Sequence, residues 1–344
     1  MDSHSAIEYL DKKIKAEEFN LKGNFIECEL DISDSYEQIK KLIKTYKPAT
    51  IVNLAHNPSA AFSMIDRDSA RYVLSNNILG INDLLWAIKE VSPEIHLINI
   101  GTTGEYDHCS NIDVREGYFK FTKNGRESAE MIFPRRPGSI YHSSKVSMTY
   151  IIDFLCRAWN LTCTDIMQGI VIGSYSDEMD KSKIYSPLHV DEAFGTVLNR
   201  FIVEAKLGLP LTIYGKGEHS RPFLALNDSV QALLIAIQNR PDSGKVRVWN
   251  QLSSWLTINE MANSVKDVIK KEFNDNVELS YIETPRNENT NKVYYNFETD
   301  ILKSLGYKPT RTIEQEIKYT YSLLNNENLQ DLKDKFLPEI KFTR

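Results

Sequence analysis

The stretch "IHLINIG", residues 95–101, is a short apolar run followed by Thr102. A run of this length and character predicts a buried strand. Downstream, residues 141–159 predict a long helix, and "LTCTDIMQ", residues 161–168, predicts the next strand. A strand, a helix and a second strand in this order indicate a βαβ unit. They therefore favour an α/β fold with a parallel sheet covered on both faces.

The same alternation continues in both directions along the chain. Toward the amino terminus we expect helices at 7–18, 34–46 and 70–91, and strands at 24–32 and 50–55. The helix at 34–46 is expected to begin with a capping box of Asp34 and Glu37. Toward the carboxyl terminus we expect a strand at 223–228 with a helix after it, a strand at 246–251, and two helices opened by the capping boxes Thr257/Glu260 and Thr312/Gln315. Less regular segments near 175–225 and 275–344 predict a second lobe over the carboxyl ends of the strands, where open α/β sheets bind ligands.

The composition excludes several classes of protein. The chain has 344 residues, of which 42% are hydrophobic and 26% charged, as in an ordinary globular protein. Its net charge of −6 argues against a broad basic face for nucleic acid. No run of about 18 apolar residues occurs, so we expect no membrane insertion. The four cysteines show no CxxC pair and no metal-like spacing, so we expect reduced thiols, no metal site and a cytoplasmic location.

A tyrosine followed four positions later by a lysine occurs three times, beginning at Tyr9, Tyr36 and Tyr141. Only Tyr141 opens a predicted helix after a strand that ends in a hydroxyl residue, Thr102. Positions i and i+4 of a helix lie on one face, so Tyr141 and Lys145 can meet one ligand. A nearby ammonium lowers the pKa of a tyrosine, which makes Tyr141 a candidate base with Thr102 beside it.

Thr102, Tyr141 and Lys145 resemble the catalytic triad of the extended short-chain dehydrogenases/reductases that act on nucleotide sugars. Three further segments are similar to motifs of that family, namely "LDISD" (30–34), "NNILGINDLLWAIKE" (76–90) and "NFETDILKSLGYKPTRTIEQEI" (296–317). Nine blocks in the same order resemble the branch of the family that forms UDP-sulfoquinovose: "SMIDR", "GTTGEYD", "NIDVREGY", "NGR", "YHSSKV", "QGIVIG", "FGTVLNRF", "YGKGEHSR" and "VYYN".

The resemblance implies a Rossmann-like, doubly wound parallel sheet and a smaller carboxyl-terminal substrate lobe. The expected Rossmann domain spans residues 1–172, with later contributions from about 190–208 and 223–272. The expected nucleotide-sugar lobe comprises about 173–189, 209–222 and 273–344. The implied reaction joins UDP-glucose and sulfite, using bound NAD that is restored in each turnover, in a protein that we expect to be a homodimer.

The resemblance also assigns roles to individual residues. Glu105 and His142 would carry proton transfers beside the triad of Thr102, Tyr141 and Lys145. NAD would contact Asp31, Ile32, Asn82, Tyr141 and Lys145. The nucleotide sugar would contact Thr102, Gln168, Asn199, Arg200, Thr212, Tyr214, Arg221 and Arg286.

One feature of the family is not found in the sequence, because no Gly-rich turn stands at its start. We therefore expect the first βαβ unit to be missing, the strand at 50–55 to be an open edge that self-associates, and NAD to bind weakly. Two alternatives stay open. One is a nucleotide-sugar 4-epimerase or 4,6-dehydratase with the same triad, and the other is a non-catalytic truncated fragment.

Overall fold

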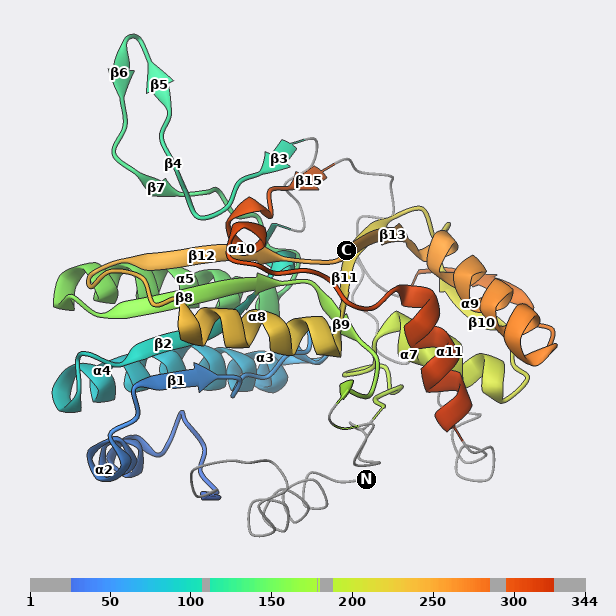
Figure 1. The fold of residues 1–344 in the computed structure, drawn as a ribbon, viewed down its shortest axis with the longest axis horizontal. Helices are drawn as coiled ribbons and strands as arrows, with labels where there is room; N and C mark the ends of the chain where they lie inside the picture. Colours follow the sequence, from blue (N-terminus) through green and yellow to red (C-terminus); the bar gives the residue numbers. More distant parts are fainter. Residues whose placement is uncertain (1–25, 107–111, 178, 180–187, 285–294, 325–344) are drawn as a thin grey trace.

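A four-stranded parallel sheet forms the centre of the computed structural model (Figure 1). The structure describes residues 26–106, 112–177, 179, 188–284 and 295–324. The sheet contains β1 (Thr50–Asn53), β2 (His96–Thr102), β8 (Thr162–Gln168) and β12 (Val246–Gln251), in the order β1-β2-β8-β12. All four strands were predicted from their apolar runs, and the parallel arrangement is confirmed.

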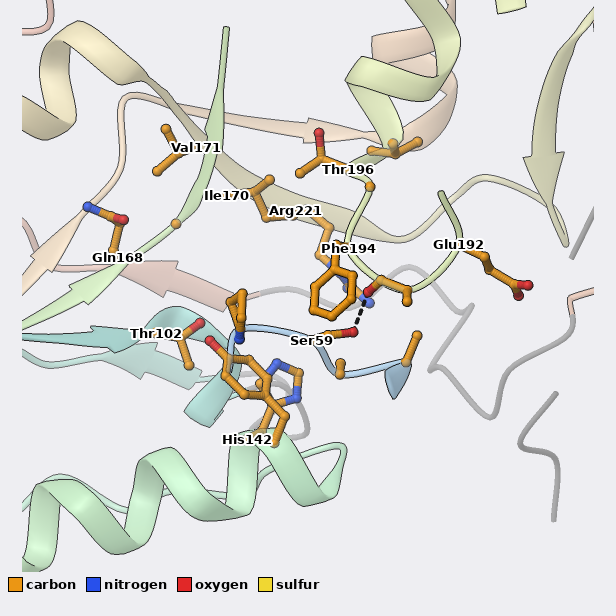
Figure 2. A pocket seen from close by; sticks show the side chains of 18 of the residues that line it. Ser59, Thr102, His142, Gln168, Ile170, Val171, Glu192, Phe194, Thr196 and Arg221 are labelled. Atoms are coloured by element: carbon orange, nitrogen blue, oxygen red, sulfur yellow. Dashed lines mark hydrogen bonds between the residues drawn. The ribbon is translucent and has the colours of Figure 1, made fainter. Parts of the chain in front are cut away.

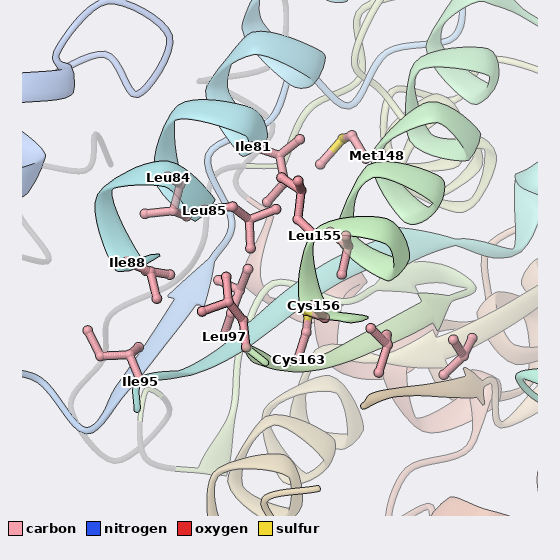
Figure 3. Close-up of a cluster of buried hydrophobic side chains, with 14 of the residues drawn as sticks. Ile81, Leu84, Leu85, Ile88, Ile95, Leu97, Met148, Leu155, Cys156 and Cys163 are labelled. Carbon is pink, nitrogen blue, oxygen red and sulfur yellow. The ribbon is translucent and has the colours of Figure 1, made fainter. Parts of the chain in front are cut away.

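Helices cover both faces of this sheet, because its side chains alternate between two hydrophobic cores. Leu97 of β2 packs with α4 (Gly80–Val91) and α5 (Ile140–Trp159), as Figure 3 shows. The next residue, Ile98, points the other way and packs with α8 (Leu226–Gln238). Two further helices belong to the first layer, α2 (Tyr36–Tyr46) and α3 (Arg67–Leu74). The predicted helix at 70–91 is continuous through α3, a π-helical turn η2 (Ser75–Leu79) and α4.

Two predictions near the amino terminus are wrong in the described residues. Residues 26–31 form no strand and their side chains are mostly exposed, because a strand needs a partner for its backbone ladder and these residues pair with none. The expected capping box of Asp34 and Glu37 is also absent, since α2 begins after Ser35 and no side chain caps it. The predicted helix at 7–18 lies outside the described residues.

A second lobe surrounds its own hydrophobic core. It contains a sheet of β9 (Ile170–Ile172), β11 (Ser220–Ala225) and β13 (Ser254–Thr257), and a pair of β10 (Leu211–Tyr214) with β14 (Leu279–Ile282). Three helices pack there, α7 (Val197–Lys206), α9 (Ile258–Phe273) and α11 (Ile313–Leu323). The predicted capping boxes of α9 and α11 are confirmed.

The second core differs in extent from the lobe expected from the sequence. Helices α7 and α9 fall in the segments 190–208 and 223–272, which the sequence analysis assigned to the Rossmann domain. Their apolar faces, with Phe201 and Val265 fully buried, instead pack against β10, β11 and α11. Which lobe a helix joins depends on the partner of its apolar face, and helical periodicity does not encode that partner.

Shorter elements complete the described chain. They are η1 (Phe62–Met64), η3 (Thr103–Tyr106), β3 (Ile112–Val114) paired with β15 (Tyr295–Phe297), β4 (Tyr118–Phe119) paired with β7 (Met131–Ile132), β5 (Thr122–Lys123) paired with β6 (Arg126–Glu127), and α10 (Asp300–Ser304). The β5–β6 hairpin projects from the body (Figure 1) and turns at Asn124-Gly125, both with positive φ, as a two-residue hairpin loop requires. No helix of the described residues is long and apolar enough to cross a membrane.

Candidate active site

A cavity of about 540 Å³ lies at the carboxyl ends of β2 and β8, between the central sheet and the second lobe. One side is formed by the loop after β1 and by the start of α5, and the other by the segment 190–197 with β11 (Figure 2). The Ser59 hydroxyl donates a hydrogen bond to the carbonyl of Ala193, which ties these two sides together. The cavity therefore occupies the position expected for ligands of an open α/β sheet.

Thr102, Tyr141 and Lys145 line this one cavity. Thr102 is the last residue of β2, and Tyr141 lies in the first turn of α5. The helix start is held in place by two contacts: the Ser139 side chain caps the backbone N–H of His142, and the backbone N–H of Tyr141 donates to the Ser63 hydroxyl at 3.0 Å. The structure thus brings together three residues that the sequence separates by up to 43 positions.

Lys145 is fixed by two partners that the sequence analysis did not identify. Its Nζ donates to the carbonyl of Ile100 at 2.7 Å and lies 2.8 Å from Nδ1 of His56. Burial lowers the pKa of Lys145 to about 8, although the charges of Glu105 and Asp165 act in the opposite direction. The ammonium lies 5.9 Å from the centre of the Tyr141 ring.

The expected lowering of the Tyr141 pKa is wrong for this structure. Burial raises the pKa of Tyr141, and the charge of Glu105 raises it further, while a hydrogen bond with Thr102 lowers it. Lys145 is not among these influences, because its donors are directed to Ile100 and His56 rather than to the phenol. The phenol is therefore the favoured form of Tyr141 in the free protein.

His142 lines the cavity beside Tyr141, with 5.0 Å between the two ring centres. Its imidazole packs directly on Gly104, where a Cβ atom would lie 2.2 Å from Nε2 of His142. The backbone N–H of Gly104 also donates to the Thr102 hydroxyl at 3.1 Å. Glycine at position 104 consequently allows the strand end and the histidine to approach each other closely.

Glu105, expected to take part in proton transfer, does not line the cavity. Its side chain is fully buried and forms an ion pair with Arg135, with 2.8 Å between Oε2 and the guanidinium nitrogen. Burial raises the pKa of Glu105 to about 7, Arg135 opposes this shift, and Asp165 adds to it. In this structure Glu105 faces Arg135, below the end of β2, and is not among the residues that line the cavity.

A chain of buried polar side chains runs under the cavity and was missed in the sequence. Asn53 Nδ2 lies 2.8 Å from Nε2 of His56 and donates to Asn99 Oδ1 at 3.2 Å. Asn99 Nδ2 donates to Asp165 Oδ1 at 2.8 Å, and Thr149 donates to Asp165 Oδ2 at 2.7 Å. The sequence did contain a sign of this network, because Asn53, Asn99 and Asp165 are polar residues inside three apolar strands. The register of the sheet then places these three residues side by side.

Four of the predicted substrate residues line the other end of the cavity: Gln168, Arg200, Tyr214 and Arg221. Gln168 is held by its amide nitrogen, which donates to Ser229 at 2.8 Å and to Gln251 at 2.9 Å. The Arg200 guanidinium stacks over the Tyr214 ring with its carbon 4.3 Å from the ring centre. Two arginines and an aromatic ring thus face the cavity on the side of the second lobe.

Two predicted substrate residues do not line the cavity. Asn199 is not among the residues that line it, and Thr212 supports Arg200 through its carbonyl, which accepts a hydrogen bond from the guanidinium at 2.6 Å. Asn199 directly precedes the lining residue Arg200 on α7, whereas Thr212 lies on the same face of β10 as the lining residue Tyr214, two positions along the strand. Arg286 lies outside the described residues.

A second cavity of about 580 Å³ adjoins the first and shares Leu54, His56 and Pro58 with it. Asp31 and Ile32, predicted to contact a cofactor, line its far end. The remaining predicted contact, Asn82, does not line either cavity, and its amide donates to Asp83 at 3.0 Å. Asn76, on the preceding turn η2, does line the second cavity.

Comparisons with known proteins agree on one family. The model described as the NAD dependent epimerase/dehydratase family matches residues 3–250. UDP-sulfoquinovose synthase of Sulfolobus acidocaldarius is 38% identical over 313 residues, which cover 90% of this chain and 79% of that protein. The chloroplastic UDP-sulfoquinovose synthase of Spinacia oleracea is also 38% identical, and the match covers 90% of this chain but 63% of the spinach protein.

The fold is shared with solved structures that are more distant in sequence. A UDP-glucose 4-epimerase of Thermotoga maritima, solved with UDP-glucose, superposes with a TM-score of 0.64 at 20% identity, covering 92% of this chain and 94% of that one. At this identity the likeness shows the fold alone, which is the Rossmann-like α/β architecture predicted from the sequence.

We predict that Glu105→Gln reduces the pH dependence of stability between pH 4.5 and 7. Burial raises the pKa of Glu105 from 4.5 to about 7, so in this window the folded protein holds a proton that the unfolded chain releases. The stabilisation from that proton is complete below pH 4.5 and is lost as the pH rises through 7. Urea unfolding at pH 5 and pH 7 measures the difference, with the exposed Glu127→Gln as the control. An equal decline in stability in both variants and the parent would contradict the prediction.

Proposed function

The chain belongs to the NAD dependent epimerase/dehydratase family, and we propose that its reaction is the formation of UDP-sulfoquinovose from UDP-glucose and sulfite. The observation that carries this proposal is the 38% identity to a UDP-sulfoquinovose synthase over 90% of the chain. The dTDP-glucose 4,6-dehydratase of Salmonella typhimurium is only 24% identical over a similar span. A synthase therefore accounts for the sequence better than a dehydratase does.

The two adjoining cavities fit the two ends of a dinucleotide. At one end the Asp31 carboxylate has its pKa lowered by hydrogen bonds from Ser33, so it is ionised and able to accept hydrogen bonds from ribose hydroxyls. At the other end Lys145 uses two donors on Ile100 and His56, and a lysine ammonium has three. Asp31, Ile32, Tyr141 and Lys145 would hold NAD, which when bound accepts a hydride from C4 of the sugar and later returns it.

Tyr141 is the proposed base for the C4 hydroxyl. Thr102, with which Tyr141 shares a hydrogen bond, orients the hydroxyl at the end of β2. Since burial raises the pKa of Tyr141, the phenolate is the minor form at neutral pH, and the oxidation should become faster as the pH rises. The same phenol returns its proton to the C4 oxygen when C4 is reduced again.

The second lobe is the proposed site for the nucleoside diphosphate. The guanidinium groups of Arg200 and Arg221 both line that end of the cavity and suit diphosphate oxygens, which accept bidentate hydrogen bonds. Gln168, between these arginines and Thr102, is placed to contact the sugar. The arrangement directs the sugar toward Tyr141 while its phosphates remain in the second lobe.

His142 is the proposed carrier of the remaining proton transfers. A keto group at C4 acidifies C5, so that water is eliminated when C5 loses a proton and C6 loses its hydroxyl. Sulfite then forms a carbon–sulfur bond at C6, and a proton returns to C5. The overall balance is UDP-glucose and hydrogen sulfite giving UDP-sulfoquinovose and water. His142 lines the cavity beside Tyr141, within the part of the site where these protons move.

The proposed reaction is tested by incubating the protein with NAD and UDP-glucose, with and without sulfite, and identifying the products by mass spectrometry. We expect UDP-sulfoquinovose only when sulfite is present. Conversion of UDP-glucose to UDP-galactose, unaffected by sulfite, would instead identify a 4-epimerase. Accumulation of a 4-keto-6-deoxy sugar would identify a 4,6-dehydratase.

We predict that Tyr141→Phe lowers kcat/KM by roughly 100- to 10,000-fold, the usual contribution of a general base. The ring volume is kept, and the backbone hydrogen bond to Ser63 does not involve the phenol, so the fold should persist. Steady-state kinetics and a thermal melt measure the two effects. Tyr46→Phe, at an exposed tyrosine of α2, is the matched control. Activity within a few-fold of the parent would remove Tyr141 from the mechanism.

We also propose that the protein is a homodimer that associates through α4 and α5. Exposed apolar residues lie on α5 and at the end of η2, the turn that leads into α4: Leu79 is 50% exposed, Tyr150 47% and Phe154 58%. Tyr150 and Phe154 are one helical turn apart, so they form a ridge that the same helices of a second copy can receive around a two-fold axis.

Phe154→Asp should convert the dimer to a monomer, because the new charge would be desolvated in the middle of the apolar face. Light scattering coupled to size exclusion gives the mass directly. Leu234→Asp, at a leucine of α8 that is 53% exposed on the opposite side of the sheet, should leave the dimer unchanged. A monomeric parent, or dissociation by both substitutions, would refute this interface.

A further inference from the structure

Glu204 is a buried acid beside Arg200 in the second lobe. It lies on α7 one helical turn after Arg200, so the two side chains share one face of the helix. The Glu204 side chain is fully buried, whereas Arg200 lines the cavity. Oε1 of Glu204 lies 3.7 Å from Nε of Arg200, and neither atom has a hydrogen-bond partner in the described part of the chain. A buried carboxyl oxygen without a hydrogen bond is costly, so it marks a strained or a functional position.

The neighbours of Glu204 favour its ionised carboxylate. Oε2 accepts the backbone N–H of Thr212 at 3.0 Å, and Oε1 faces the Nε–H of Arg200. A proton on either oxygen would therefore point at another donor. Burial raises the pKa of Glu204, while the charge of Arg200 and the hydrogen bonds with Thr212 lower it. The bond to Thr212 ties the carboxylate to β10, so the strand sets its position independently of the arginine.

The same contacts decide which nitrogen of Arg200 can meet a ligand. Nε lies toward Glu204, and Nη2, on the same edge of the guanidinium, donates to the carbonyl of Thr212 at 2.6 Å. One face of the guanidinium stacks on the Tyr214 ring, with 4.3 Å between its carbon and the ring centre. One edge and one face are thus occupied, and Nη1 remains for an acceptor in the cavity, which Arg221 also lines (Figure 2).

We propose that Glu204 is a positioning residue that holds the Nε edge of Arg200 and thereby directs Nη1 to the diphosphate of a nucleotide sugar. The inference rests on the proposed function, because it adds a supporting residue to the proposed diphosphate site. A phosphate oxygen at Nη1 accepts a charge-assisted hydrogen bond in a direction that is fixed before binding. Without the carboxylate, the ligand itself would have to order the arginine, and that ordering opposes binding. Glu204 acts only through Arg200, because it does not line the cavity.

Glu204→Gln tests this role, because it keeps the size of the side chain and changes its hydrogen bonding. The amide has one oxygen where the carboxylate has two, so an oxygen that accepts from Thr212 leaves the amide nitrogen facing the Nε–H of Arg200. Calorimetry on the full chain measures the Kd of UDP, and competition with UDP gives the Kd of uridine, which lacks phosphate. We expect the Kd of UDP to rise about tenfold, as when one charge-assisted hydrogen bond is weakened, and the Kd of uridine to stay unchanged.

Two further variants show whether the effect passes through Arg200. Arg200→Gln should weaken UDP binding, and adding Glu204→Gln to it should cause no further loss, because the residue that Glu204 positions is already gone. Glu316→Gln is the matched control, since Glu316 is also a buried acid of the second lobe, on α11, and does not line the cavity. The control should leave the Kd values of UDP and uridine unchanged.

The proposed reaction and this inference can fail separately. A parent that binds UDP more tightly than uridine but forms no UDP-sulfoquinovose overturns the proposed reaction and leaves the role of Glu204 intact. A parent that binds UDP no more tightly than uridine overturns the role of Glu204.

The variants decide between a positioning and a structural role. A loss for UDP alone, absent from the Arg200→Gln background and from the control, supports the proposal. It is overturned by unchanged or tighter UDP binding in Glu204→Gln, by an equal loss for uridine or in the control, or by a full additional loss in the double variant. Should Glu204→Gln fail to fold, a crystal structure of the parent with UDP decides. A phosphate oxygen on Nη1 of Arg200 supports the proposal, and a phosphate on Nε, or none on Arg200, overturns it.

Discussion

Four ionisable side chains are buried together beneath the cavity, and their compensation of one another is the constraint on which the site depends. Arg135 and Lys145 are the basic members, and Glu105 and Asp165 are the acidic ones. A single buried charge without a partner costs several kcal/mol, so removing one member leaves the others poorly compensated. The group links the end of β2, the start of α5 and the middle of β8, and Thr102 and Tyr141, which have proposed roles in the reaction, lie on the first two of these elements.

The two lobes are joined at the carboxyl end of β8. Strand β8 belongs to the central sheet and β9, two residues later, to the sheet of the second lobe. Gly169 separates them, and a Cβ atom there would lie 2.9 Å from the carbonyl oxygen of Pro222. Gln168 therefore stands at the crossing, between the triad and the arginines. A ligand that reaches from Tyr141 to Arg221 contacts both lobes, so its affinity depends on the position of one lobe relative to the other.

Much of the fold and part of the site could be predicted from local sequence. The four strands of the sheet have short apolar runs, and the two confirmed capping boxes have their partners three residues apart. Tyr141 and Lys145 share one face of a helix because of their spacing. Asn82, Asn199 and Thr212 do not line either cavity in this structure, because motif similarity identifies a neighbourhood and not which side chain faces a cavity. The strand expected at residues 24–32 failed because β-propensity does not supply a pairing partner.

The sequence by itself determined the α/β class and the order of the elements of the central sheet, and it identified Thr102, Tyr141 and Lys145 as candidate site residues, since periodicity, spacing and motif similarity are local properties of the chain. Only the tertiary structure decided that Glu105 is buried against Arg135, that burial raises rather than lowers the pKa of Tyr141, and that His56 contacts Lys145. Those outcomes depend on burial and on the register that aligns Asn53, Asn99 and Asp165 across three strands. Both arise from contacts between residues far apart in the sequence.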